Sequence, residues 1–192
     1  MKNKTFKEIA VPAIMLFVIA AICTALLAGT NLLTKDKIAE IAVQAENEAK
    51  AAVITADSFS DAMEITADGK TYTYYKANNS DGTVAGYVIA ITTKSYGGDL
   101  ACMVGISADE KITGVEITEI NDTAGLGMKA QNEDFLKQYF GKSAGIKVNK
   151  NTSSDTEIKA ITGATITSQA VTDAVNEAFN VLSQIKAGVE NG

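Results

Sequence analysis

An uncharged run at residues 9–33 constrains the fold of this chain more than any other feature. As an α-helix its 25 residues extend roughly 37 Å, enough to cross a hydrocarbon core of about 30 Å. A cleaved signal peptide is the main alternative, because lysines precede the run, but the apolar core of such a peptide has only roughly 7–15 residues. We therefore predict that residues 1–33 form a short cytoplasmic N-terminus and an uncleaved, single-pass transmembrane anchor.

The charges around this run indicate its orientation. Lys2, Lys4 and Lys7, together with the amino terminus, outnumber Lys35 and Lys37 on the other side. Because flanking lysines are retained in the cytoplasm, this bias predicts that the rest of the chain lies on the extracytoplasmic side of the cell membrane. That remainder is acidic, with 14 lysines against 22 acidic residues.

Several residue types are absent, and this excludes whole classes of function. The chain contains no histidine, tryptophan or arginine, and its cysteines are Cys23 and Cys102. A Ser-His-Asp triad, a histidine-ligated metal site and a Cys-x-x-Cys redox site are therefore excluded. The lack of arginine and the acidic balance argue against nucleic-acid binding. We expect no catalytic residue and no metal site in the chain itself, so a cofactor would have to carry any redox chemistry.

The hydrophobic periodicity changes along the chain. Residues 34–56 carry an apolar stripe at three- and four-residue steps, including Ile38, Ile41, Ala49 and Val53, which predicts a helical stalk packed against its own domain. Residues 57–192 form the remaining extracytoplasmic domain. Runs rich in Val, Ile, Thr and Tyr predict four strands there, at 71–76, 84–93, 100–107 and 112–120.

Short turn sequences separate these strands, as in an antiparallel sheet. A short helix is predicted near residues 132–139, and a longer one at 168–185 that Gly188 would stop. The predicted fold class is α+β, with one N-terminal transmembrane helix and then an antiparallel sheet packed with helices.

A turn of small and hydroxylated residues leads into the last predicted helix. It consists of Thr162, Gly163, Ala164, Thr165, Ile166, Thr167 and Ser168. Unpaired amides and the helix dipole favour an anion at such a position, so a phosphate could rest on this turn without arginine. The alternative is that one of the hydroxyls only caps the helix, since Ser and Thr are frequent there.

This segment resembles the S/T-G-A-T-x-T-S signature of the FMN-binding domain family. In that family the threonine that ends the S/T-G-A-T core is esterified to the phosphate of FMN, and the matching residue is Thr165. The resemblance implies covalent FMN on Thr165, with the other cofactor contacts of this segment at Thr162, Gly163, Ala164, Thr167 and Ser168. The family usually has an acidic residue three positions before the first S/T, where this chain has Lys159.

Two further segments carry the resemblance, which runs from about residue 84 to the last helix. Residues 122–127, D-T-A-G-L-G, are similar to the E-T-P-G-L-G segment that lines the family's flavin site. The turn Y-G-G at residues 96–98 matches the family's turn before a Met-Val-Gly-Ile strand. The cofactor contacts that these segments imply are Thr123, Gly125, Leu126 and Gly127 in the first, and Tyr96, Gly97 and Gly98 in the second.

Members of this family include the G subunit of Rnf-type ferredoxin:NAD oxidoreductases and the C subunit of sodium-translocating NADH:quinone reductases. The compact length favours the Rnf type. The resemblance then implies an electron-transfer subunit of an ion-translocating enzyme complex, which relays electrons between its ferredoxin and NAD sides. Its partners would be the other membrane subunits, and a flavin transferase would mature it. The alternatives are the C subunit of a quinone reductase, or a membrane-anchored flavin-domain sensor without redox turnover.

Overall fold

The computed structural model describes residues 2–190 and divides after Glu46 into two compact units. The helices are α1 (Lys2–Val53), α2 (Glu133–Leu136) and α3 (Thr165–Glu190), with 3₁₀ turns η1 (Gly127–Gln131) and η2 (Lys137–Tyr139). The strands are β1 (Ser58–Phe59), β2 (Met63–Ala67), β3 (Lys70–Asn78), β4 (Val84–Ser95), β5 (Gly98–Ser107), β6 (Ile112–Ile120), β7 (Lys147–Asn149) and β8 (Glu157–Lys159).

Helix α1 is continuous through the predicted anchor and the predicted stalk. It is long and apolar enough from Ile9 onward to cross a membrane. Its apolar side chains are exposed, with Leu16 and Phe17 accessible over 67 and 74 % of their surface. A continuous apolar surface of this length is stable in lipid rather than in water. The structure therefore agrees with the predicted membrane anchor.

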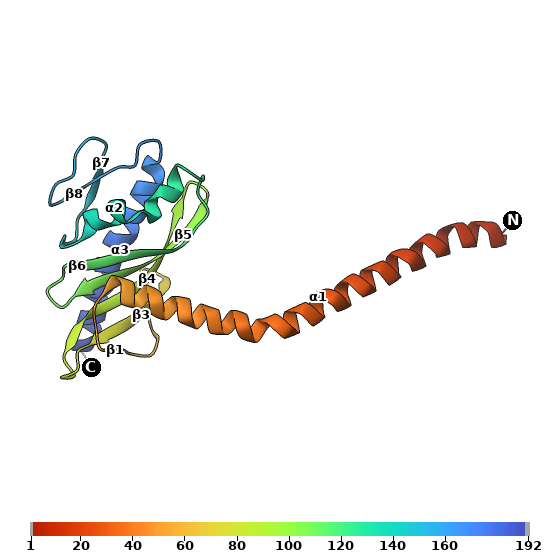
Figure 1. Cartoon of the computed structure of the whole chain (residues 1–192), viewed down its shortest axis with the longest axis horizontal. Helices are drawn as coiled ribbons and strands as arrows, with labels where there is room; N and C mark the ends of the chain where they lie inside the picture. Colours follow the sequence, from red (N-terminus) through yellow and green to blue (C-terminus); the bar gives the residue numbers. More distant parts are fainter. Residues whose placement is uncertain (1, 191–192) are drawn as a thin grey trace. The chain divides into compact units, whose positions relative to one another are not determined.

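An antiparallel sheet forms the centre of the second unit. Its strand order is β1-β3-β4-β5-β6, and β2 also pairs with β3. The four predicted strands are all present, as β3 to β6 (Figure 1). Asp68 and Gly69 join β2 to β3 with φ angles of 51° and 77°, the pair of positive angles that a two-residue type I′ turn requires. The predicted antiparallel α+β fold is confirmed.

Helix α3 lies along one face of this sheet (Figure 1). Its predicted apolar positions are all buried in the core there: Ala170, Val171, Ala174, Val175, Ala178, Leu182 and Ile185. The helix begins at Thr165, three residues before the predicted start, and continues through Gly188 to Glu190. The prediction that Gly188 stops it is wrong, because one glycine weakens a helix by only about 1 kcal/mol and the packed turns before it outweigh that cost.

The end of α1 packs on the opposite face of the sheet. Val53 lies directly over Gly105 and Gly114, which are partners across β5 and β6. A Cβ on Gly105 would come within 2.3 Å of the Val53 carbonyl oxygen, and one on Gly114 within 2.6 Å of the Val53 Cα. Thr113 donates a hydrogen bond from Oγ1 to the same carbonyl at 2.6 Å. The two glycines thus form a flat seat that the backbone of α1 occupies.

The last residues of the predicted stalk stripe are buried at this end of the helix. Ala49 and Val53 are buried, whereas Ile38 and Ile41 are exposed. Lys50 is also buried, and its ammonium lies 4.3 Å from the centre of the Tyr75 ring. Within the second unit, the residues of the stripe at the end of α1 are thus part of the core.

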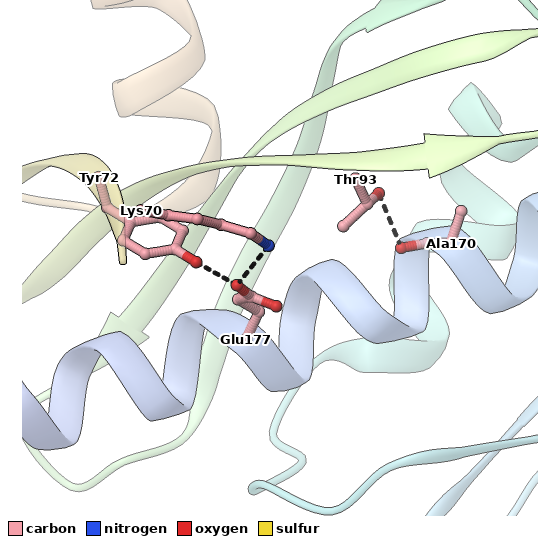
Figure 2. Close-up of polar contacts among 5 residues, drawn as sticks. All are labelled: Lys70, Tyr72, Thr93, Ala170 and Glu177. Carbon is pink, nitrogen blue, oxygen red and sulfur yellow. Dashed lines mark hydrogen bonds and ion pairs between the residues drawn. The ribbon is translucent and has the colours of Figure 1, made fainter. Parts of the chain in front are cut away.

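Polar contacts fasten the middle of α3 to the sheet (Figure 2). The Glu177 carboxylate accepts hydrogen bonds from the Tyr72 hydroxyl and, at 3.3 Å, from the Lys70 ammonium. Thr93 donates from Oγ1 to the Ala170 carbonyl at 3.2 Å. Burial raises the pKa of Tyr72 to about 12, and the bond to Glu177 adds to this effect. The same bond lowers the pKa of Glu177, against the opposing effect of burial.

Candidate functional site

A tight turn starts the last helix. Ala164 donates its N–H to the Ile161 carbonyl at 2.9 Å, and Gly163 has a φ of 81° at the third position, as a type II turn requires. Ser168 holds this turn from inside the helix, because its hydroxyl accepts from the Ile161 N–H and donates to the Ala164 carbonyl, both at 3.0 Å. The small residues of the signature therefore build a turn that delivers Thr165 as the first helical residue.

The hydroxyls of this segment have different surroundings. Thr162 and Thr165 are exposed, whereas Thr167 and Ser168 are buried at 1 and 0 % accessibility. The hydroxyls of Thr167 and Ser168 are engaged in hydrogen bonds within the protein. Thr165 is thus the exposed hydroxyl in the first turn of α3, next to amides that have no partner within the helix.

Asp122 connects this turn to the sheet. Its carboxylate is buried at 6 % accessibility and accepts from the Ser95 hydroxyl at 2.6 Å, from the Gly97 N–H at 2.6 Å and from the Thr167 hydroxyl at 2.5 Å. Burial alone would raise the pKa of Asp122, but the hydrogen bonds from Ser95, Thr167 and Gly97 outweigh it and lower the pKa below its usual value. An ionised carboxylate therefore joins the β4–β5 turn, the loop after β6 and the start of α3.

Two glycines allow the backbone to pack tightly around Asp122. A Cβ on Gly97 would lie 2.1 Å from the Asn121 carbonyl oxygen, and a Cβ on Gly127 would lie 2.5 Å from the Asp122 Cβ and 2.8 Å from the Thr167 Oγ1. Any larger residue at these positions would force the segments apart. Gly97 of the Y-G-G segment and Gly127 of the G-L-G segment are therefore needed so that their backbones can pack closely against residues 121–122.

The loop after β6 contains a second turn of the same kind. Leu126 donates its N–H to the Thr123 carbonyl at 3.1 Å, and Gly125 has a φ of 76° at the third position. A Cβ on Gly125 would meet nothing within 4 Å, so this glycine serves the backbone conformation alone. The turn leaves Leu126 partly exposed, at 43 %.

A cavity of about 430 Å³ opens where these three segments meet. Of the predicted site residues, it is lined by Tyr96, Thr123, Leu126, Gly127, Gly163, Ala164, Thr165 and Thr167. The predicted contacts that do not line it are Gly97, Gly98, Gly125, Thr162 and Ser168. Asp122 and Ile166, which were not among the contacts predicted from the sequence, also line the cavity.

The lining of this cavity fits a phosphorylated aromatic ligand. Its volume falls within the range of small-molecule sites, and apolar side chains from Leu126, Ile166 and Tyr96 can contact a ring system. Thr165, Ile166 and Thr167, the first residues of α3, line the same cavity, and the first amides of a helix suit a phosphate. FMN has both of these parts.

Comparison with known proteins places the chain in a family. The G subunit of the Na⁺-translocating ferredoxin:NAD⁺ oxidoreductase complex of Acetobacterium woodii is 37 % identical over 188 residues, and the match covers 90 % of each chain. The chain belongs to this family of Rnf-type G subunits. Residues 1–53 match the RnfG N-terminal region, and residues 95–180 match the FMN-binding domain, a range that contains every residue of the cavity lining.

Two further relatives are also G subunits of ion-translocating oxidoreductase complexes. The G subunit of the proton-translocating ferredoxin:NAD⁺ oxidoreductase complex of Clostridium ljungdahlii is 33 % identical, with 85 % of each chain covered. The G subunit of the ion-translocating oxidoreductase complex of Methanosarcina acetivorans is 32 % identical, with 92 % of this chain and 96 % of that one covered.

Two solved structures have the same fold. The C subunit of the Na⁺-translocating NADH-quinone reductase from Parabacteroides distasonis matches with a TM-score of 0.50 and 23 % identity, over 57 % of this chain and 60 % of that chain. NqrC from Shewanella oneidensis matches with a TM-score of 0.53 and 21 % identity, over 72 and 74 %. At these identities the likeness concerns the fold, and the Rnf-type assignment rests on the sequence relatives.

Proposed function

We propose that this chain is the membrane-anchored electron-transfer subunit of an Rnf-type ion-translocating ferredoxin:NAD oxidoreductase, and that it carries FMN in the cavity at the start of α3. The family supports the complex and the cofactor. The single observation that supports the location is the cavity itself, which gathers the three segments of the flavin resemblance around one space. Bound there, FMN would accept and donate electrons, while the protein holds and surrounds it.

We further propose that FMN is attached through a phosphoester to Thr165. Thr165 is exposed, lines the cavity and lies beside the free amides of the first helical turn. Thr167 and Ser168 are less suited, because their buried hydroxyls hold Asp122 and the turn at residues 161–164. Thr162 is exposed but lies outside the cavity lining.

Attachment requires a flavin transferase with FAD as the donor. The Thr165 Oγ–phosphorus bond forms, the bond between the two phosphates of FAD breaks, AMP leaves, and a base of the transferase takes the hydroxyl proton. The ring system is unchanged by this reaction. Lys159, where members of the family usually have an acidic residue, is exposed on β8 and accessible to such an enzyme.

The orientation and the partners complete the proposal. The lysine bias before the anchor supports a cytoplasmic N-terminus and an extracytoplasmic flavin domain. The other membrane subunits of the complex would exchange electrons with FMN, and the ion path would lie in those subunits.

Mass spectrometry of the full chain, co-expressed with a flavin transferase, tests the acceptor residue. We expect the parent protein to gain the mass of one FMN less one water. Thr165→Val keeps the β-branched shape and removes the hydroxyl, so the added mass should disappear.

The matched control is Thr162→Val, which alters an exposed threonine of the same turn and should retain the added mass. Thr167→Val is unsuitable, because it removes a donor to Asp122. An FMN adduct on Thr165→Val would refute the acceptor assignment. A parent protein that never gains the mass would favour a sensor domain without covalent flavin.

A further inference from the structure

Asp122 is more than a structural link, because this residue also lines the cavity. We propose that Asp122 is a positioning residue for FMN, which holds the cavity walls together and places a fixed negative charge beside the flavin, so that the reduction potential of the flavin is lowered. This inference rests on the proposed function, which puts FMN in this cavity.

The hydrogen bonds around Asp122 stabilise a carboxylate. Three donors converge on it, namely the Ser95 hydroxyl, the Gly97 N–H and the Thr167 hydroxyl. A carboxylate only accepts, and its two oxygens can accept about four hydrogen bonds. In an asparagine the amide oxygen could still accept from the Gly97 N–H, and its NH₂ group would face the two hydroxyls, which would then accept instead of donate. Asp122→Asn therefore keeps the shape of the side chain and removes its charge.

The charge is also fixed in position. Gly127 and Gly97 bring the backbone so close to residues 121–122 that a Cβ on either glycine would overlap the loop. The donors come from different elements: Ser95 from the end of β4, Gly97 from the β4–β5 turn and Thr167 from α3. With the side chain 6 % accessible, bulk water screens this charge poorly.

A fixed negative charge acts on the redox equilibrium of a flavin beside it. Reduction by two electrons adds negative charge to the ring, and protons follow from the solvent. A carboxylate on a residue that lines the same cavity disfavours the arrival of the electrons and leaves the oxidised form comparatively unaffected. Removal of this charge should therefore make the flavin easier to reduce.

Spectroelectrochemical titration of the full flavinylated chain in detergent tests this inference. In Asp122→Asn we expect the ratio of reduced to oxidised FMN at a fixed potential to rise about tenfold, a positive shift of about 30 mV for two electrons. Glu119→Gln is the charge-matched control, since Glu119 is an exposed acid at the end of β6, three residues away. Its potential should equal that of the parent.

Asp122→Glu separates charge from shape, because it keeps the carboxylate. It should carry FMN at the parent potential even where Asp122→Asn loads poorly, and that rescue would support the inference. An unchanged potential in Asp122→Asn would overturn it. If neither variant loads FMN, Asp122 is needed for folding of the loop, and the inference is overturned as well. A parent chain without FMN would instead refute the proposed function.

Discussion

Gly127→Ala tests whether the close packing around Asp122 stabilises the fold. The new methyl group would lie 2.5 Å from the Asp122 Cβ, 2.7 Å from its Oδ2 and 2.8 Å from the Thr167 Oγ1. These neighbours have little freedom to move, since Asp122 and Thr167 are both buried and are hydrogen-bonded to each other. The backbone of Gly127 needs no special conformation, so the clash itself is the perturbation.

The magnitude follows from three contributions. Overpacking of a filled site costs about 2 kcal/mol. Separation of the charged hydrogen bond between Thr167 and Asp122 adds about 2 kcal/mol. Alanine has lower conformational entropy than glycine in the unfolded chain, and this offsets about 0.7 kcal/mol of the destabilisation. We expect the free energy of unfolding to fall by about 3 kcal/mol, a shift of roughly 1.5 M in the urea midpoint at a slope of about 2 kcal/mol/M.

The measurement is urea unfolding of the full chain in detergent, followed by near-UV circular dichroism of the tyrosines, since the chain has no tryptophan. Gly125→Ala is the matched control. Its methyl group would meet open space, and only its positive φ opposes substitution, at a cost of about 1 kcal/mol. If Gly127→Ala cost no more than Gly125→Ala, the packing argument would be wrong.

Three further predictions concern the seat of α1, the fastening of α3 and the orientation of the chain. Gly114→Ala should lower the free energy of unfolding in urea by about 2 kcal/mol, because its methyl group would displace Val53. An unchanged free energy of unfolding would contradict the close packing of α1 on the sheet. The raised pKa of Tyr72 should make the fold lose stability as the pH rises from about 10 toward 12. Burial also raises the pKa of Tyr139 and Cys102, so Tyr72→Phe should show a smaller loss than the parent in unfolding measured across that window, and an equal loss would contradict the prediction. Ser80→Cys, in the exposed β3–β4 turn, should react with a membrane-impermeant maleimide in intact cells. The parent should not react, because Cys102 is buried with a pKa raised to about 12 and Cys23 lies in the anchor. Protection of the Ser80→Cys variant would refute the extracytoplasmic orientation.

Local patterns in the sequence predicted most of the fold. The long apolar run, the four strands and the apolar face of α3 each repeat over enough residues to be recognised without tertiary information. Strand β2 was missed, although Asp68-Gly69 is a strong hairpin signal and the residues before it pair with β3 in the structure. The parallel pair of β7 and β8 was missed because each strand has three residues, too few for any period to emerge.

The candidate site was predicted in part, for a physical reason. The glycine and threonine motifs form turns, and the conformation of a turn depends on residues that are neighbours in the sequence. The role of Asp122 is not local, because its donors are 25 to 45 residues away along the chain. The same holds for Gly105 and Gly114, which resemble ordinary strand glycines until Val53 is seen to lie on them. Partners that only the fold brings together leave no periodic trace in the sequence.

The shape of the cavity bears on why an ester would be useful here. Tyr96, Leu126 and Ile166 line it, yet each is exposed, at 71, 43 and 56 %. Walls that remain this open bury only part of a ligand, so non-covalent retention of FMN would be weak. The proposed bond to Thr165 would remove dissociation without requiring the walls to close. The exposed side of the cavity would then stay available to redox partners, so that the protein would keep its cofactor while electrons pass in and out at the same face.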